Sequence, residues 1–563
     1  MNMKKGFLGC FFAVFVLSAA SGYSSPFDLI SVGDPVINDI RFISLETGMP
    51  ILSFTPPFSP HKIRNFLEAV DFNSLSVAAQ KAYDRIEGRL NRQSRISTAG
   101  RHFLFTIDLK VAVDANVRFN TDIDWFPYNF HVPPFLSAPM RFHFSDFVQL
   151  YFEPVIAVDP EFFRGTSGSF YTGRHRTVGH LSHNIPHSVS RLDTTVPLRA
   201  YIAMGGPWWS FQLGRDRLSF GSGMMGNLTI SDNPFFYEFA RLSFFTDFFK
   251  YTLLVNQSPL DVRGVFDIRY PYFPNPDRTT QRYFYLHRFD FTLFNRLSIG
   301  ISEGLIVGYS PLELRFLNPL MIFHSFFAWW QYGRWDGGYY APPGNLEFTS
   351  SLLSIEINWN IARSLFAYGQ FVMNQLTLAL EAGDGGYGIP NGVGFMAGVR
   401  FSHSLPSGWG SLFTLEFIHT SPFLYMGASP FASFIKTRQL DMQIGRLHHS
   451  FFGFARDTIA LALDASFFDR DIVSFSAGFM MLIQGESSTT WWNWAESEEA
   501  FLARTPTGVP QNNFILSFDA KWRFSPRFTV TGGIAGIYSQ NNRHNEGQNE
   551  FGGQFSFGVR FWH

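Results

Sequence analysis

The feature that most constrains this chain is an alternation of apolar and polar residues with a period of two. Between Phe103 and Phe119 every odd position is apolar, and most even positions carry a polar or charged side chain. The stretch from Phe555 to Phe561 repeats the pattern close to the C-terminus. A period of two indicates β-strands with one dry face, and about ten residues of it suit a strand that faces lipid.

The connections between such strands alternate between short and long. Tight connections are predicted at residues 205–207, 246–249, 294–297, 360–364, 403–410, 468–471 and 524–527. Long polar or aromatic stretches separate them at 256–282, 310–349, 377–392, 420–454, 485–512 and 539–551. Outer-membrane barrels have short periplasmic turns and long outer loops. The fold class predicted is therefore an all-β transmembrane protein, a closed antiparallel outer-membrane β-barrel, for which we prefer eighteen strands over sixteen.

The composition suits a barrel with a lipid-facing exterior. Aromatic residues make up 18% of the chain and charged residues only 16%, whereas soluble domains carry about 25% charged residues. After the N-terminus the sequence has no apolar run of about 18 residues, the length that a membrane-spanning helix needs. The net charge of −1 gives no indication of nucleic-acid binding.

Three regions are predicted along the chain. Residues 1–22 read as a secretory signal peptide, with two lysines, an apolar run and then small residues. The only cysteine, Cys10, lies within it, so we expect no disulfide and no thiolate metal site. Residues 23–100 are predicted as a periplasmic helical segment, with helices starting near Ser59 and Leu75. Residues 101–563 are predicted as the barrel.

These regions place the protein in the outer membrane of a diderm bacterium. We expect outer-membrane lipid and the barrel assembly machinery as its partners, together with no nucleic acid and no cofactor. We expect a monomer.

The stretch from Gly221 to Gly226 has the spacing Gly-x-Gly-x-x-Gly of a dinucleotide-binding loop. That spacing indicates a nucleotide only between a strand and a helix that begins at the third glycine. Here Thr229, Ile230 and Pro234 follow, and these residues do not start a helix. We therefore predict that residues 221–238 bind no nucleotide and lie inside the barrel mouth.

The same stretch resembles the signature of the Wzi family, outer-membrane proteins of capsule assembly. The matching positions are Arg217, Phe220, Gly221, Gly223, Leu228, Ser231, Asp232 and Asn233, with Pro234 one or two places early. Three further stretches are similar in order, namely 287–320, which contains Ser302, Glu303, Asn318 and Pro319, then 368–374 and 415–425. Asn374 stands where relatives tend to have Asp. The resemblance implies an eighteen-stranded barrel with a small helical periplasmic part. It also implies a non-catalytic surface lectin that holds capsular polysaccharide.

A glycan-binding surface needs flat apolar faces for sugar rings and planar polar groups for hydroxyls. Two predicted outer loops carry both kinds of residue. The candidates are Trp329, Trp330, Arg334, Trp335, Asp336, Tyr339, Tyr340, Trp491, Trp492, Asn493 and Trp494. The alternative is that these aromatic residues form the outer interface girdle or pack loop on loop.

Two other functions stay open on the sequence, a passive porin-like channel and, with less support, an outer-membrane hydrolase. No nucleophile elbow or zinc-binding helix is present. The histidines at 175, 180, 183 and 187 lack a nearby acidic partner, and residues 383–394 lack regular calcium ligands. We therefore expect no catalytic and no metal site. Occupancy of the lumen separates the remaining functions, since a porin needs an open lumen.

Overall fold

The computed structural model describes residues 27–51, 53–91, 96–99, 103–119, 133–144, 147–158, 180–186, 192–193, 196–260, 281–308, 311–323, 349–375, 390–427, 429–439, 447–469, 472–489 and 498–562. The predicted signal peptide, residues 1–22, lies outside this part of the chain.

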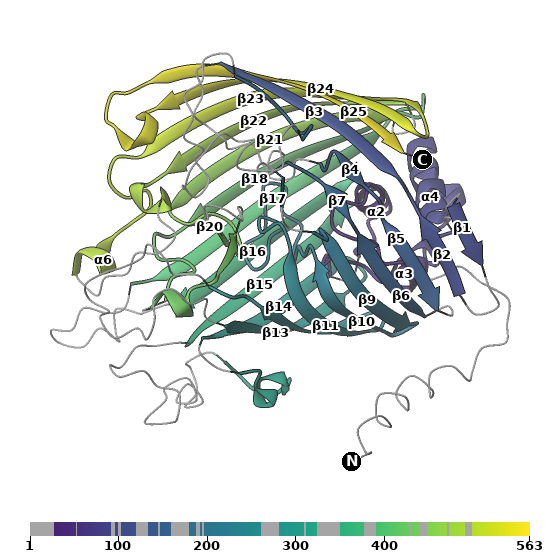
Figure 1. The fold of residues 1–563 in the computed structure, drawn as a ribbon, viewed down its shortest axis with the longest axis horizontal. Coiled ribbons are helices and arrows are strands. Elements are labelled where there is room, and N and C mark those ends of the chain that lie inside the picture. The colour runs from purple at the N-terminus through teal and green to yellow at the C-terminus, as the bar shows by residue number, and fades with distance from the viewer. Residues whose placement is uncertain are drawn as a thin grey trace.

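Most of the described chain forms one antiparallel sheet that curves around an interior (Figure 1). Its strands are β1 (Ile96–Ala99), β2 (Phe103–Ile107), β3 (Lys110–Phe119), β4 (Leu136–Ser137), β5 (Met140–Phe144), β6 (Val148–Glu153), β7 (Val155–Ile156), β8 (His180–His183), β9 (Arg199–Gly206), β10 (Trp209–Asp216), β11 (Tyr237–Phe245), β12 (Phe249–Gln257), β13 (Arg282–Leu293), β14 (Leu297–Gly308), β15 (Thr349–Ala362), β16 (Leu365–Gln375), β17 (Gly392–Ser404), β18 (Gly410–Thr420), β21 (Thr458–Asp469), β22 (Val473–Gln484), β23 (Gln511–Ser525), β24 (Phe528–Gln540) and β25 (Glu550–Trp562). A separate two-stranded sheet contains β19 (Ile435–Gln439) and β20 (Leu447–Phe451).

The helices are short. They are α2 (Val36–Thr47), α3 (Pro60–Glu68), α4 (Val77–Leu90) and α6 (Glu498–Leu502), with 3-10 turns η1 (Phe72–Ser74), η4 (Leu314–Leu317), η6 (Pro430–Ala432), η7 (Glu486–Thr489) and η8 (Asn542–His544). Among the described helices, none is long and apolar enough to cross a membrane.

The strands pair mainly with their neighbours in chain order. From β9 to β18, and again from β21 to β25, each strand pairs with the next, and β18 pairs with β21. β25 pairs with β3, while β2 pairs with β5 and β6 pairs with β9. Each tight connection predicted from the sequence joins two paired strands, which confirms the alternation of short and long connections. We call the end with the short connections the turn end, and the other the loop end.

The stretch from Phe103 to Phe119 is not one continuous strand, as its alternation predicted. It divides into β2 and β3 at Asp108 and Leu109, where the pairing partner on one side changes from β5 to β4. At the break the Asp108 amide donates to the Pro139 carbonyl, and the Asp108 carboxylate pairs with Arg141 at 2.7 Å. The break therefore lies at the buried Asp108, where an ion pair with Arg141 accompanies the interruption of the regular pairing between strands.

The two faces of the sheet differ as the period of two predicted. On β25, Phe555 and Phe557 are 50% and 54% exposed on the outer face, whereas Gln554 is buried on the inner face. A sheet with an apolar outer face and a polar inner face is the reverse of a soluble β-sandwich. The pattern is confirmed for the described strands.

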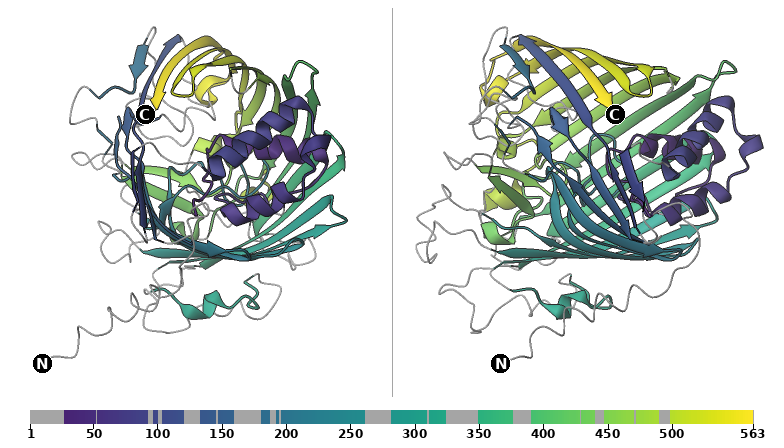
Figure 2. Two further views of the ribbon diagram at one scale, coloured as in Figure 1. Left: turned by 90° about the vertical axis from the view of Figure 1, so that its right-hand side faces the viewer. Right: turned by 45° about the vertical axis from the view of Figure 1, so that its right-hand side comes forward.

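Residues 27–91 form a helical unit at the turn end of the sheet, where Figure 2 shows α2, α3 and α4 in the opening. α3 and α4 were predicted, and their apolar faces form a shared core with α2 and Phe468. Ser76 caps α4 by accepting from the Ala79 amide. Ser59 precedes α3 as predicted, but its hydroxyl makes no capping bond. α2 was not predicted.

Two long segments fold back into the interior. The first is residues 217–236, between β10 and β11, which we call the glycine segment. The second is residues 421–457, between β18 and β21, which we call the inserted loop and which contains β19 and β20. Their apolar side chains and the inner faces of the surrounding strands form one buried cluster that includes Phe220, Leu228, Tyr425, Phe452 and Ile515.

The interior is filled unevenly along the strands. On β23 the inward residues Asn513 and Ile515, towards the loop end, are buried, whereas Asp519, towards the turn end, is exposed. Met224 and Met225 of the glycine segment bound a cavity against β21, β22 and β23 at this level. Near β21–β25 the loop-end half of the interior is therefore packed, and the turn-end half is open to solvent.

Candidate functional site

The glycine segment closes on itself before it contacts the sheet. Phe220 and Ile230 form an antiparallel bridge in which the Phe220 amide donates to the Ile230 carbonyl. The Gly223 amide donates to the Asn227 side-chain oxygen at 3.0 Å, and no helix begins at Gly226. The segment is thus a compact loop and has none of the strand–helix geometry of a dinucleotide site.

A carboxylate of the protein itself occupies the amides of the glycine turn. The amides of Met224 and Met225 donate to the two oxygens of Glu416 on β18, at 2.6 Å and 2.8 Å. The Tyr368 hydroxyl of β16 donates to the same carboxylate at 2.6 Å. Successive backbone amides in a turn form an anion-binding concavity, and here Glu416 fills it. These amides are therefore not available to a phosphate.

The glycines of the turn permit close backbone approach. A Cβ on Gly221 would lie 2.0 Å from the Gln370 side-chain nitrogen, and the φ of this residue is +130°. A Cβ on Gly223 would lie 1.9 Å from the Gly226 carbonyl oxygen. Both positions exclude a side chain, and the first also needs a conformation that favours glycine.

Gln370 on β16 holds both arms of the segment. Its amide nitrogen donates to the Phe220 carbonyl at 2.8 Å, and its oxygen accepts from the Leu228 amide at 2.7 Å. Arg400 on β17 donates to the Ser222 carbonyl. The segment is therefore fixed by inward side chains of three neighbouring strands, β16, β17 and β18.

The glycine segment also joins the inserted loop. Asn233 donates from its side-chain nitrogen to the Gly453 carbonyl at 2.9 Å, and the Ser231 amide donates to the Phe452 carbonyl at 2.5 Å. The Tyr425 hydroxyl donates to the Leu228 carbonyl at 2.6 Å. The two segments therefore form one packed body in the interior.

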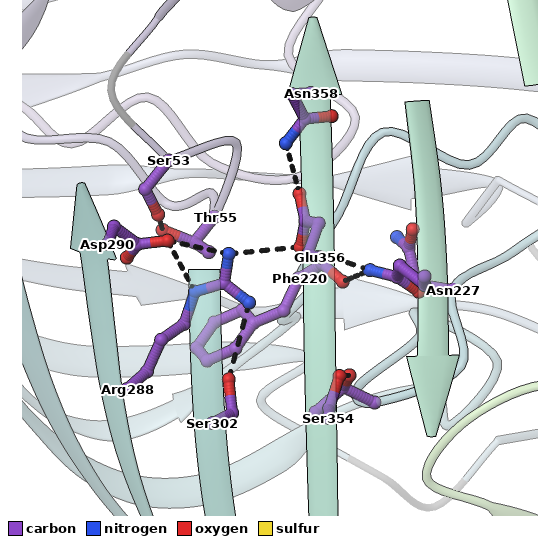
Figure 3. A network of polar contacts seen from close by, with 12 residues as sticks. Ser53, Thr55, Phe220, Asn227, Arg288, Asp290, Ser302, Ser354, Glu356 and Asn358 are labelled. Atoms are coloured by element: carbon purple, nitrogen blue, oxygen red, sulfur yellow. Dashed lines mark hydrogen bonds and ion pairs between the residues drawn. The ribbon is translucent and has the colours of Figure 1, made fainter. Parts of the chain in front are cut away.

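A buried ionic network lies beside this body (Figure 3). Arg288 on β13 contacts Asp290 at 2.7 Å and Glu356 at 3.0 Å, and all three side chains are almost fully buried. Glu356 also accepts from Gln370 at 3.1 Å, which links the network to the glycine segment. Pairing of this kind offsets much of the cost of burying charges.

Several of the pieces of sequence that carry the family resemblance meet in the interior, whereas Asn318 and Pro319 are exposed beside η4. Stretch 368–374 supplies Gln370, and stretch 415–425 supplies Glu416 and Tyr425. Ser302 accepts from Arg288 at 3.4 Å. Segments far apart in the chain therefore converge around the glycine segment.

Asn374, the departure from the family pattern, has a clear structural role. Its nitrogen donates to the Met426 carbonyl at 2.7 Å, and its oxygen accepts from the Tyr425 amide at 2.9 Å. An ionised aspartate could accept but not donate here. The amide therefore suits the backbone of the inserted loop that it meets.

The candidate site residues from the sequence fall into two groups. In the glycine segment, Arg217 and Asp232 form an ion pair at 2.5 Å, and Gly221, Gly223, Ser231 and Asn233 make the contacts described above. The glycan-binding candidates lie outside the described residues; they are Trp329, Trp330, Arg334, Trp335, Asp336, Tyr339, Tyr340, Trp491, Trp492, Asn493 and Trp494. Their assignment stays a prediction.

Sequence reasoning did not single out the residues that hold the segment. Glu416, Gln370, Tyr368 and Arg400 each lie at an inward position of a strand, where a polar residue is expected in any barrel of this class. The available signal was weak: three of the four lie in or beside stretches that resembled the family.

No protein-family model and no curated protein matches the sequence. Among solved structures the chain is similar to Wzi of Escherichia coli, an outer membrane protein involved in group 1 capsule assembly and described as a carbohydrate-binding β-barrel. The identity is 13%, the TM-score is 0.54, and the match covers 95% of this chain and 99% of that chain. This likeness shows the fold.

Two Pseudomonas aeruginosa proteins are similar at a greater distance. OccK3 (OpdO) is 11% identical with a TM-score of 0.38, covering 81% of this chain and 95% of that chain. OprD is 8% identical with a TM-score of 0.37, covering 82% and 95%. The likeness to Wzi alone supports an outer-membrane β-barrel fold.

Proposed function

We propose that the sheet is a closed barrel of eighteen strands in the outer membrane of a diderm bacterium. β2 with β3, β4 with β5, and β6 with β7 each count as one interrupted strand that precedes the fifteen strands from β9 onward. The β25–β3 pairing supports closure, because it joins the last strand to the first. The turn end then faces the periplasm and the loop end faces outward.

We propose further that the protein is a member of the Wzi family and acts as a surface lectin. It binds extracellular capsular polysaccharide, helps to assemble the capsule layer and does not cleave the polymer. The observation that carries this proposal is the filled interior. The glycine segment and the inserted loop form a buried apolar cluster across the barrel, where a porin needs an open path.

The binding residues are proposed to lie on the outer loops. Trp491, Trp492 and Trp494 form one aromatic cluster, and the stretch 328–340 forms another. Stacking of one sugar on an indole contributes about 0.5–1.5 kcal/mol beyond burial. A long polymer that contacts several such sites gains further from avidity.

Two measurements test the proposal. The purified protein is applied to a glycan array, where we expect binding to capsular polysaccharide fragments. In cells, replacing Trp491, Trp492 and Trp494 by alanine should release surface polysaccharide into the medium while the barrel stays folded. The matched control is Trp208→Ala, because Trp208 is 59% exposed but lies at the turn end.

The outcomes separate the alternatives. Retention of polysaccharide by the triple variant contradicts the assignment of residues 491–494. An empty glycan array together with an unchanged capsule in a deletion strain contradicts the lectin proposal and favours the channel. Shortened polysaccharide products would favour the hydrolase.

A further inference from the structure

A group of buried cations lies between the helical unit and the inner wall of the barrel. Lys62 is on α3, Arg241 is on β11 and Lys250 is on β12, and each is less than a tenth exposed, at 7%, 3% and 5%. Repulsion from both Lys250 and Arg241 acts on Lys62, so the three charges lie close together. Like charges out of water repel strongly and need compensation.

Both lysines converge on one residue of the helical unit. The Lys62 ammonium donates to the Ser53 carbonyl at 2.9 Å. The Lys250 ammonium donates to the Thr55 hydroxyl at 2.5 Å and to the Ser53 hydroxyl at 3.4 Å. Ser53 has a φ of +59°, a left-handed conformation that is strained for a non-glycine residue. Neutral oxygens thus hold two ammonium groups near each other.

The neighbouring carboxylates do not balance this charge. Asp290 and Glu356 are the acidic side chains that act on Lys250, and Arg288 forms ion pairs with both. Figure 3 shows Ser53 and Thr55 beside Asp290 and Arg288. One oxygen of Asp290 has no hydrogen-bond partner and attracts Lys250. Asp216 attracts Arg241 but already forms an ion pair with Arg199 at 2.6 Å. Each neighbouring carboxylate is therefore already engaged by another arginine.

Arg241 has no hydrogen bond or ion pair with any described residue, although only 3% of its surface is exposed. On the inner face it stands opposite Gln212 of β10, and Asn256 of β12 lies on its diagonal. The side-chain oxygen of Gln212 and both polar atoms of Asn256 also lack partners. Buried polar groups are almost always bonded, so a buried guanidinium without a bonded acceptor indicates a missing anionic ligand.

We infer that Arg241, Lys250 and Lys62 hold a small oxyanion between α3 and the barrel wall. The guanidinium and the two ammonium groups supply charge-assisted donors. The ligand is a phosphate, a sulfate or the carboxylate of an acidic sugar. The site does not depend on the proposed lectin function. It attaches the helical unit to the strands that surround it.

The lowered pKa of Lys62 is consistent with a site at which a bound anion would stabilise the charged lysine. Burial first, and then repulsion from Lys250, hold the pKa of the Lys62 ammonium well below its usual range. A bound oxyanion favours the charged lysine and raises that pKa again.

Equilibrium dialysis of the full-length protein in detergent tests the inference, with radiolabelled phosphate and sulfate at constant ionic strength. We expect one saturable site per chain and an increase in the unfolding temperature as it fills. Glucuronate is added as a competitor: displacement of phosphate by glucuronate identifies a sugar carboxylate as a ligand, and no displacement identifies an inorganic anion. Both results support the oxyanion site.

Three variants locate the binding. Arg241→Met and Lys250→Met should each weaken phosphate binding at least tenfold. Arg241→Lys keeps the positive charge and should bind phosphate with intermediate affinity. This variant also tests the site if Arg241→Met fails to fold. The matched control is Arg215→Met on β10, whose arginine is paired with Glu238. Absence of a saturable site, or a site that these variants leave unchanged, overturns the inference.

Discussion

At the residue scale, Glu416 explains why a nucleotide-like glycine turn occurs in a protein with no predicted nucleotide. The turn presents successive amides as a phosphate-binding loop does, and the chain supplies the anion from its own strand β18. The glycines allow the backbone to approach its neighbours closely in both kinds of loop. In both, successive backbone amides bind an anion, which here is the Glu416 carboxylate and not a phosphate.

Glu416→Ala should destabilise the protein by about 3 kcal/mol, because the variant leaves two buried amides without an acceptor. The measurement is the free energy of unfolding in guanidinium chloride, followed by tryptophan fluorescence in detergent. Asp519→Asn is the control, since Asp519 is exposed inside the barrel, and it should change stability by less than about 0.5 kcal/mol. Equal stability of the Glu416→Ala variant and the wild type would remove the carboxylate from its assigned role.

The sequence predicted which residues lie in the interior segment but not what holds them. Gly221 and Gly223 were identifiable because their spacing is a local pattern. Glu416 was not, because its partner Met224 lies 192 positions away in the chain. An apolar–polar alternation with a period of two predicts whether a side chain lies on the inner or the outer face of the sheet. It does not predict which residue that side chain contacts in the interior.

At the scale of elements, ion pairs attach the helical unit to the sheet. Arg89 of α4 contacts Asp28 and Asp34, both at 2.8 Å, and Asp28 lies 3.6 Å from Arg141 of β5. Burial alone would raise the pKa of Asp28, but Arg89 and Arg141 hold it well below its usual range. The unit is therefore held by charge as well as by its apolar core.

Asp28→Asn should reduce stability by about 3 kcal/mol at neutral pH, since it breaks a mostly buried pair. The pKa of Asp28 is lowered in the folded state, so its contribution is complete above the unfolded value of about 3.9 and is lost as pH falls below that value. Unfolding of wild type and variant at pH 7, 5 and 3 should show a difference that is constant to pH 5 and smaller at pH 3. A difference that vanishes by pH 5 would contradict the pairing, and Asp71→Asn, an exposed turn carboxylate, is the control.

The helical unit also marks a limit of prediction from sequence. α3 and α4 were predictable because their apolar residues recur at helical spacing with polar residues between them. α2 was not, because Val36, Ile37, Ile40, Phe42, Ile43 and Leu45 are all buried. Such a helix is enclosed on most sides, and its β-branched residues give no amphipathic period.

At the scale of the molecule, the packed half of the interior predicts the electrical behaviour of the barrel. Wild-type protein in a planar lipid bilayer should carry no steady ion current. Removing residues 429–455 and linking β18 to β21 by a short loop should open a current, because the buried cluster loses Phe434, Phe451 and Phe452. Removing residues 541–549, which are mostly exposed at the loop end, should leave the bilayer insulating. A steady wild-type current would favour the channel over the lectin.

The interior contacts also impose an order on assembly. The Gly221 amide donates to the Phe54 carbonyl near the N-terminus, while Asn233 reaches Gly453 across 220 positions. Contacts at such separation form late, since the chain between them must first be arranged. In the closed barrel proposed above, the pairing of β25 with β3 leaves no lateral entrance to the interior, so we expect these contacts to form before it. The cell therefore has a brief interval, after β18 and the inserted loop are made and before the last strand docks, in which the glycine segment must be enclosed.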